Sequence, residues 1–384
     1  MNHCEYLNLL GKSSLSPLNS SSRASCKIYV SDEGYGPLVR QSAIISSIRR
    51  FSNQIDFTLQ TERFAESVPR LIDNIEVSSV YNNISWAKQA DGAPAIEEIR
   101  AIFADYPERA NAYVERECSS VKADFILSDF VYEAFPVAAR LGIPAFGVAH
   151  FTWDWFFCKL FPPVINDRVL EWFFACAEQA EVLYFPPFTP GEIMSHYAHK
   201  ARRVPLIVRE MRSVNNVQPN DRFKVLIMDS GSGLLAPHIY RALSRVHLLP
   251  DFQFYISSRF QCEADNVTNI DPNELFSDYI PHMDLVICRA GFNTISECIA
   301  YRTPFLLIGE AVNPEMSENM LNLKKAQLGS LVALESFANE LHEFLPRFVD
   351  HEYRHILHMM NEHAVEHNGA DIIAQDILNR VGEV

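Results

Sequence analysis

The sequence predicts an α/β fold of two doubly wound, parallel-sheet domains of the Rossmann-like kind, facing each other across a cleft. Three observations carry this prediction. The chain has 384 residues, too many for one ordinary hydrophobic core. Short apolar runs alternate with segments of helical period in both halves. Glycine or aspartate turns follow many of those runs, as is typical of parallel sheets that bind ligands at the carboxyl ends of their strands.

The first half follows this rhythm from residue 27 onward. Short apolar runs predict strands at 27–32, 55–59, 125–130, 145–151 and 181–185. Apolar residues at helical spacing predict helices at 38–48, 96–117 and 133–141. Residues 1–24 are rich in serine and lack periodicity, so we expect a flexible extension there.

The second half repeats the pattern after a zone at 186–220 that holds several prolines and polar runs. We place the domain boundary in this zone. Strands are predicted at 225–230, 252–258, 284–289 and 304–308, with helices at 237–246, directly after 289–294, and from about 317.

The amino-acid composition indicates which classes of partner and which cellular compartment the protein suits. The formal net charge of −15 argues against nucleic acid. The eight cysteines, at positions 4, 26, 118, 158, 176, 262, 288 and 298, form no C-x-x-C pair. They are best read as reduced thiols in a cytoplasmic protein. We expect no signal peptide and no transmembrane segment.

Residues 284–329 carry the clearest chemical signal. An apolar run ends in Arg289-Ala290-Gly291-Phe292-Asn293-Thr294, and a helical pattern starts at once. A helix start behind a glycine turn offers unpaired N–H groups and a positive dipole end, which suit a phosphate. Two alternatives stay open: Thr294-x-x-Glu297 also reads as a capping box, and Arg289 as a surface charge rather than a phosphate ligand.

The order of several motifs resembles the GT-B glycosyltransferase superfamily. They are Gly291 to Thr294 with Glu297, Gly142-Ile143-Pro144, Phe151-Thr152-Trp153-Asp154, Glu315 with Asn319, and Gly369-Ala370 with Ile373-Ala374. The chain is similar to enzymes that add N-acetylglucosamine to the peptidoglycan lipid precursor, and to the glycosyltransferase-like domain of L-arabinokinases. The resemblance covers about residues 26–382.

This resemblance implies a GT-B fold with an acceptor-side domain at 25–205, a nucleotide-sugar domain at 206–366, and a helix at 367–384 that crosses back to the first domain. It also implies roles for site residues. The nucleotide and its phosphates would contact Gly231, Ser232, Ile270, Gly291, Asn293, Thr294 and Glu297. Arg289 stands where many relatives have a small residue or histidine, and its charge makes it a further candidate phosphate ligand. Glu297 would take the ribose hydroxyls, whereas Glu315 and Asn319 would lie near the donor sugar.

Two departures from the family pattern bear on catalysis. Pro37 stands where relatives often carry a histidine base, and Met316 replaces the usual glutamine after the donor-loop acid. Proline cannot move a proton, so another residue must act as the general base. Glu33, Asp129 and His150 are candidates because they follow predicted strands at the cleft; each is alternatively a structural residue.

Two further clusters favour structural interpretations. Aromatic residues at 151–157 read as packed core more readily than as an acceptor pocket or a membrane-resting face. His351, His355 and His358 are predicted to share one helix face, and we expect no metal site there.

We therefore expect a metal-independent hexosyltransferase. It would move a hexose or N-acetylhexosamine from a nucleotide sugar, UDP-linked and serving as co-substrate without a further cofactor, to a small-molecule, lipid-linked or protein acceptor. Peripheral membrane contact stays open. The alternatives are a nucleotide-sugar hydrolase or epimerase on the same fold, and a nucleotide-sugar-binding protein without catalysis.

Overall fold

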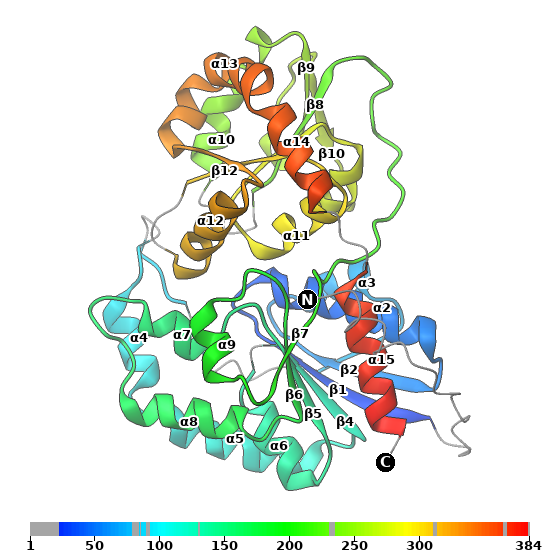
Figure 1. Ribbon diagram of the computed structural model, residues 1–384, viewed down its shortest axis with the longest axis vertical. Helices are drawn as coiled ribbons and strands as arrows, with labels where there is room; N and C mark the ends of the chain where they lie inside the picture. The colour runs from blue at the N-terminus through cyan, green and yellow to red at the C-terminus, as the bar shows by residue number, and fades with distance from the viewer. Residues whose placement is uncertain are drawn as a thin grey trace.

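The computed structural model describes residues 23–78, 84, 86–89, 93–129, 131–229, 235–309, 313–363 and 367–382. The expected extension at 1–24 lies outside the described residues except for its last two positions. Figure 1 shows two lobes, one above the other, each built around a parallel sheet flanked by helices. The prediction of two doubly wound parallel-sheet domains is confirmed.

The lower lobe holds a seven-stranded sheet in the order β3-β2-β1-β4-β5-β6-β7. Every pairing in it is parallel. The strands are β1 (Ala24–Val30), β2 (Ile55–Gln60), β3 (Glu76–Ser78), β4 (Phe125–Asp129), β5 (Ala145–Val148), β6 (Val182–Phe185) and β7 (Ala201–Arg203). The helices are α2 (Tyr35–Phe51), η2 (Ala65–Ser67), α3 (Val68–Leu71), α4 (Ile96–Phe103), α5 (Tyr106–Ser120), α6 (Ala134–Leu141), α7 (Trp153–Cys158), α8 (Asp167–Ala177) and α9 (Gly191–His196).

The upper lobe holds a six-stranded parallel sheet in the order β10-β9-β8-β11-β12-β13. Its strands are β8 (Phe223–Ile227), β9 (Phe252–Ser257), β10 (Val267–Ile270), β11 (Leu285–Cys288), β12 (Phe305–Ile308) and β13 (Ser330–Val332). Its helices are α10 (Ala236–Leu243), η3 (Val246–Leu248), η4 (Ser258–Phe260), η5 (Phe276–His282), α11 (Phe292–Ala300), α12 (Pro314–Ala326), α13 (Leu334–His351) and α14 (Tyr353–Glu362).

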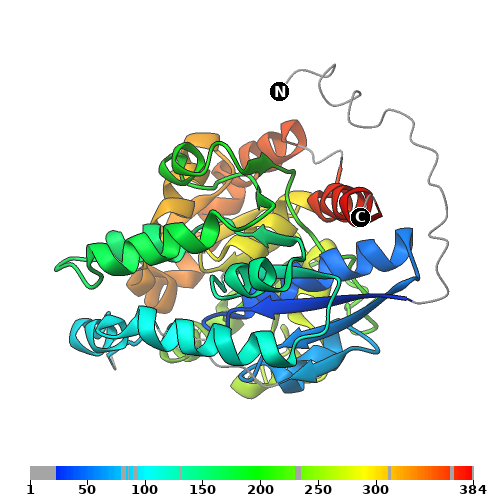
Figure 2. The ribbon, with the colours of Figure 1, turned by 90° about the horizontal axis from the view of Figure 1, so that it is seen from below.

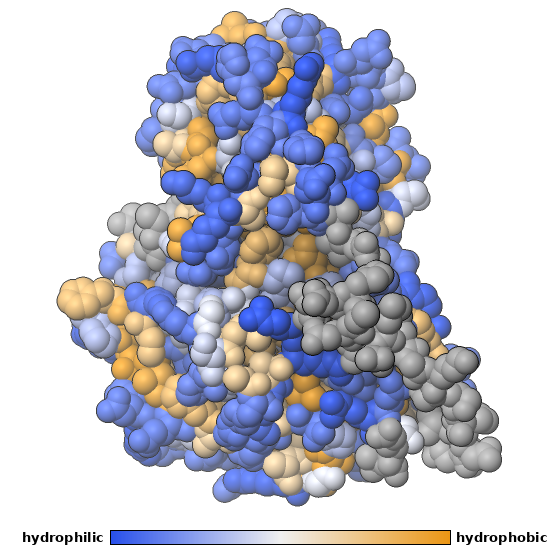
Figure 3. Space-filling model, in the orientation of Figure 1, coloured by the Kyte–Doolittle hydropathy of each residue, from blue (hydrophilic) through white to orange (hydrophobic). Residues whose placement is uncertain are grey.

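The lower sheet separates two hydrophobic cores because side chains alternate between the faces of a strand. Within β1, Tyr29 joins a core shared with α5, α6 and α8. Ile28 and Val30 point the other way, into a core shared with α2. The aromatic residues at 151–157 are buried in the first of these cores, as the sequence suggested. On the face shown in Figure 3 the lobes are mostly hydrophilic outside, and hydrophobic residues gather at the waist between them.

The chain crosses between the lobes twice, and the two crossings lie side by side. The Gly369 N–H donates to the Leu206 carbonyl over 2.8 Å, and the Val208 N–H donates to Asn368 Oδ1 over 3.1 Å. After the second crossing, α15 (Gly369–Gly382) packs on α2, as Figure 2 shows from below. Its residues Ala370, Ile373, Ala374 and Ile377 complete the core that contains Ile28.

One local prediction is refined and another is wrong. The helical region expected at 96–117 holds two helices, because Pro107 stands in the first turn of α5 and suits a helix start rather than an interior. His351 ends α13, whereas His355 and His358 belong to α14, so the three histidines do not share a helix. The described residues contain no cluster of His, Cys, Asp or Glu that could hold a metal ion. None of the described helices is long and apolar enough to span a bilayer.

Gly369 is required at the crossing because the first crossing passes close to it. A Cβ atom at this position would lie 2.2 Å from the Pro205 carbonyl oxygen. We predict that Gly369→Ala lowers the free energy of unfolding by about 1–3 kcal/mol, measured by urea denaturation. Gly191→Ala is the matched control, since a Cβ there meets no atom within 4 Å. Equal effects of the two substitutions would contradict this packing.

Candidate functional site

The start of α11 lies where the upper lobe meets the lower one (Figure 1). Gly291 is the N-cap residue, and no side chain caps the helix. The space where a Gly291 side chain would project is open, because a Cβ there meets no atom within 4 Å. Since Gly291 is the cap, Thr294 lies inside the first turn. The capping-box interpretation of Thr294 and Glu297 is therefore wrong. Glu315 accepts from the Phe292 N–H, whereas the next N–H groups of the first turn have no side-chain cap from Gly291.

Glu297, one turn further along α11, is buried with an exposed fraction of 3%. Its Oε1 lies 3.5 Å from Nε of Arg209. Arg209 Nη1 lies 2.6 Å from Oδ1 of Asp278 in η5. Burial raises the pKa of Glu297 to about 7, against the opposing attraction of Arg209. The carboxyl group of Glu297, on the helix that starts behind the open Gly291 position, thus has a pKa close to neutral pH.

A second polar network joins the lobes through Arg40 of α2. Its guanidinium donates two hydrogen bonds to Asp129, at the end of β4, with Nε–Oδ2 and Nη2–Oδ1 distances of 2.8 and 2.6 Å. Arg40 Nη1 also lies 3.3 Å from Nδ1 of His150. His150 Nε2 lies 2.9 Å from Glu315 Oε1, at the start of α12 in the upper lobe. All four side chains are buried or nearly so.

This geometry fixes the protonation of His150. A guanidinium can only donate hydrogen bonds, so Nδ1 of His150 accepts and carries no proton. The ring is then neutral, with its proton on Nε2 donated to Glu315. The pKa directions agree: burial lowers the pKa of His150 despite the pull of Glu315. Burial alone would raise the pKa of Glu315, but His150, the Phe292 N–H and Arg40 together hold it below its ordinary value.

The first turn of α11 also contacts the lower lobe directly. Phe292 stacks on the His150 ring, with centroids 4.3 Å apart and planes at 13°. Asn293 Nδ2 donates to the Gly36 carbonyl over 2.6 Å, and Asn293 Oδ1 lies 3.4 Å from Arg40 Nη1. Asn293, expected at the phosphates, therefore bridges the lobes in this arrangement. Asn319 donates to the Ala290 carbonyl over 2.8 Å and so holds α12 against the turn before α11.

The three catalytic candidates lie in different surroundings. Asp129 is fully buried, and burial raises its pKa although Arg40 and Gln41 donate to it. His150 is engaged at both ring nitrogens. Glu33 is half-buried in the turn before α2, where its Oε2 accepts from the Trp86 N–H over 2.7 Å. The structure brings Asp129 and His150 together, apart from Glu33, and catalytic roles for all three stay predictions.

The phosphate-side candidates are only partly described. Gly231 and Ser232 lie outside the described residues. Arg289 is buried directly after β11. Burial raises the pKa of Asp229, which follows β8, against the attraction of Arg259 and, after it, of Arg289. Ile270 ends β10 at the far edge of the sheet from β12 and β13. Met316 is buried in the upper core, so it offers no side chain to a sugar.

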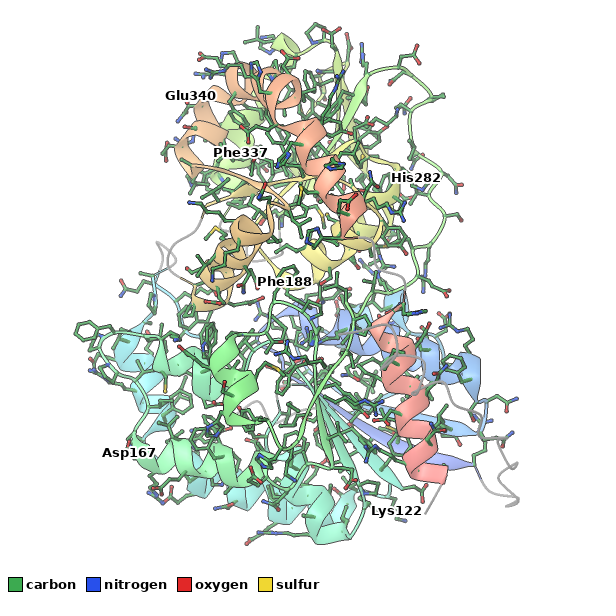
Figure 4. All side chains as sticks on the ribbon, in the orientation of Figure 1. Lys122, Asp167, Phe188, His282, Phe337 and Glu340 are labelled. Atoms are coloured by element: carbon green, nitrogen blue, oxygen red, sulfur yellow. The ribbon has the colours of Figure 1, made fainter. Side chains whose placement is uncertain are left out.

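The sequence analysis missed two residues that take part in contacts around this site. Arg209 lies in the crossing segment, four residues after Pro205, and no local signal in the sequence points to it. Phe188, after β6, has a left-handed backbone with φ of 67°, a conformation that costs energy for an aromatic residue. Its carbonyl accepts from Asn322 of α12 over 3.3 Å, and Figure 4 places it at the waist, below α12.

Comparison with known proteins identifies this arrangement. Residues 253–376, which include α11 and α12, match the model of the glycosyltransferase family 28 C-terminal domain. The chain is also similar in fold to the calicheamicin glycosyltransferase CalG4, with a TM-score of 0.67 and 13% identity over 94% of this chain and 99% of that one. The chain has the GT-B fold.

Two curated relatives of this GT-B chain differ in how much of them it spans. It is 24% identical over 290 residues to UDP-N-acetylglucosamine–N-acetylmuramyl-(pentapeptide) pyrophosphoryl-undecaprenol N-acetylglucosamine transferase of Thermosipho africanus, covering 70% of this chain and 78% of the relative. It is 25% identical over 202 residues to L-arabinokinase of Arabidopsis thaliana, covering 49% of this chain. The chain thus spans only 18% of that kinase's length.

The buried Arg40–Asp129 pair is predicted to stabilise the GT-B fold, because each charge compensates for the burial of the other. Arg40→Met leaves Asp129 buried without its cation, so we expect the free energy of unfolding to fall by about 3–5 kcal/mol, measured by urea denaturation. Arg23→Met is the control, because Arg23 and Asp56 form an exposed pair 2.7 Å apart that contributes about 1 kcal/mol or less. A similar loss in both variants would rule out this role for the buried pair.

Proposed function

We propose that this protein transfers a hexose or N-acetylhexosamine from a UDP-linked sugar to an acceptor. The observation that carries the proposal is Glu297, buried on α11 directly behind an uncapped helix start and an open Gly291 position. An ionised carboxylate accepts hydrogen bonds from both hydroxyls of a ribose. The N–H groups of the helix start suit the adjoining diphosphate.

Leaving-group stabilisation would supply the catalytic effect. As the glycosidic bond breaks, negative charge grows on the nucleoside diphosphate, and preorganised N–H groups at the start of α11 with Arg289 would stabilise it. No metal ion is needed for that role, so the proposal is a metal-independent transferase. Glu315 would exchange His150 for donor-sugar hydroxyls once the nucleotide sugar binds, and that exchange would free the Nε2 proton of His150.

The acceptor is proposed to be a small molecule, a lipid-linked precursor or a protein, in a cytoplasmic setting. The Thermosipho relative, whose name includes pyrophosphoryl-undecaprenol, supports the lipid-linked class. Cys26, Cys176, Cys288 and Cys298 are free and buried, which supports the reducing compartment.

A second candidate is a nucleotide-sugar-binding protein without transferase activity. Its support is the engagement of His150 and Asp129 with Arg40, together with Pro37 at the usual histidine position. Incubation with a UDP-sugar panel, with and without acceptor extracts, separates the candidates. Release of UDP that depends on acceptor supports transfer, release without acceptor supports hydrolysis, and binding without release supports the second candidate.

UDP binding is predicted to depend on the charge of Glu297. Glu297→Gln keeps the size of the side chain but weakens the ribose contacts, so we expect UDP affinity at pH 8 to fall by at least about tenfold, or about 1.4 kcal/mol. Isothermal titration calorimetry with UDP measures this. The fold should survive, because burial already disfavours the charge that is removed.

Glu340→Gln is the matched control for this measurement. Glu340 is exposed on α13, far from the waist in Figure 4, and its substitution should leave UDP affinity unchanged. The proposal fails if the wild-type protein does not bind UDP at millimolar concentration, or if the two variants bind UDP equally well.

A further inference from the structure

Arg209 lies on the first segment that crosses between the lobes, and its side chain reaches the proposed nucleotide site. It follows directly after Leu206 to Val208, the residues that hydrogen-bond to Asn368 and Gly369 in the second crossing. Unlike a typical linker arginine, it is buried, with an exposed fraction of 7%. Its carbonyl accepts from the Tyr301 hydroxyl over 3.2 Å, which ties its backbone to the residue that follows α11.

The guanidinium of Arg209 is anchored so that one N–H faces Glu297. Nη1 lies 2.6 Å from Asp278 Oδ1, and Nη2 donates to Ser277 Oγ over 2.6 Å. Nε lies 3.5 Å from Glu297 Oε1, and neither of these two buried atoms has a hydrogen-bond partner among the described residues. An orphaned buried donor and acceptor that face each other are costly unless their attraction compensates for burial.

We propose that Arg209 is a positioning residue for nucleotide binding, which keeps Glu297 ionised and therefore able to accept the ribose hydroxyls. This inference rests on the proposed function.

The groups around Glu297 determine how its charge responds to pH. Burial raises its pKa, the Arg209 cation lowers it, and the Asp278 carboxylate raises it. Three further groups face it: Cys298 and Tyr301 from α11 and its end, and Tyr35 from α2 in the lower lobe. Arg209 is the cation in this set. Without it, burial and Asp278 act together, and the protonated, neutral form of Glu297 persists to higher pH.

The test is the pH dependence of UDP affinity from pH 5.5 to 9.5, by calorimetry. Binding needs the ionised carboxylate, so affinity falls as pH drops through the Glu297 pKa. The midpoint is the pH at which half of this change in UDP affinity has occurred. Arg209→Gln should raise this midpoint by about one pH unit or more, since a neighbouring opposite charge shifts a pKa by about 1–3 units. We expect about tenfold weaker binding at pH 7 and recovery near pH 9.5.

Matched variants separate this effect from general damage to the protein. Arg212→Gln, an exposed arginine of the same segment, should behave as wild type. Arg209→Lys should restore most of the midpoint shift because it keeps the cation. Asp278→Asn should move the midpoint down, opposite to Arg209→Gln, which loss of folding cannot produce. Because the terminal phosphate of UDP itself titrates near pH 6, Glu297→Gln supplies the baseline at each pH.

The outcomes are distinct. Absence of UDP binding by wild type at every pH overturns the proposed function itself. Binding by wild type with the same midpoint in Arg209→Gln overturns the role of Arg209 and leaves the function standing. If Arg209→Gln does not fold, Asp278→Asn and Arg209→Lys decide. A midpoint that rises in Asp278→Asn, or that rises in Arg209→Lys by a full unit, contradicts the proposal.

Discussion

The buried guanidinium of Arg40 is the constraint from which the arrangement of the two lobes follows. A charge removed from water must be paired, and the fork of Arg40 meets Asp129 with two nitrogens. Its remaining nitrogen faces His150, which forces the neutral tautomer of that ring and aims its proton at Glu315. The buried guanidinium of Arg40 in the lower lobe therefore acts, through His150, on Glu315 in the upper lobe.

The positions of α11 and α12 in the upper lobe depend on this constraint. Phe292 stacks on the ring that Arg40 orients, and Asn293 reaches the Gly36 carbonyl, so the start of α11 is held against the lower lobe. The two carboxylates of the upper lobe then differ in their surroundings. The pKa of Glu315 is held low by His150 and its neighbours, whereas burial takes that of Glu297 to about 7. Two similar side chains of one lobe thus differ in how readily they hold a negative charge.

The sequence predicted the architecture because apolar runs and turns are local signals. The strands of both lobes that carry the site, β1, β4, β5, β8, β11 and β12, lie within or near their predicted ranges. Short edge strands such as β3, β7 and β13 were missed, since they bury little and leave little periodicity. Partners across the waist could not be predicted: nothing local says that Arg209 faces Glu297 or that Asn293 meets Gly36. The resemblance predicted ligand contacts for Glu297 and Glu315, which stay predictions, and only the fold shows what each one touches in the protein.

A crystal structure of the protein with UDP bound would test the proposed nucleotide site most directly. We expect ribose hydroxyl oxygens within about 2.6–3.2 Å of the Glu297 carboxylate, the diphosphate at the start of α11, and Arg209 still beside Glu297. A nucleotide bound with its ribose away from Glu297, or in the lower lobe, would contradict the proposed site.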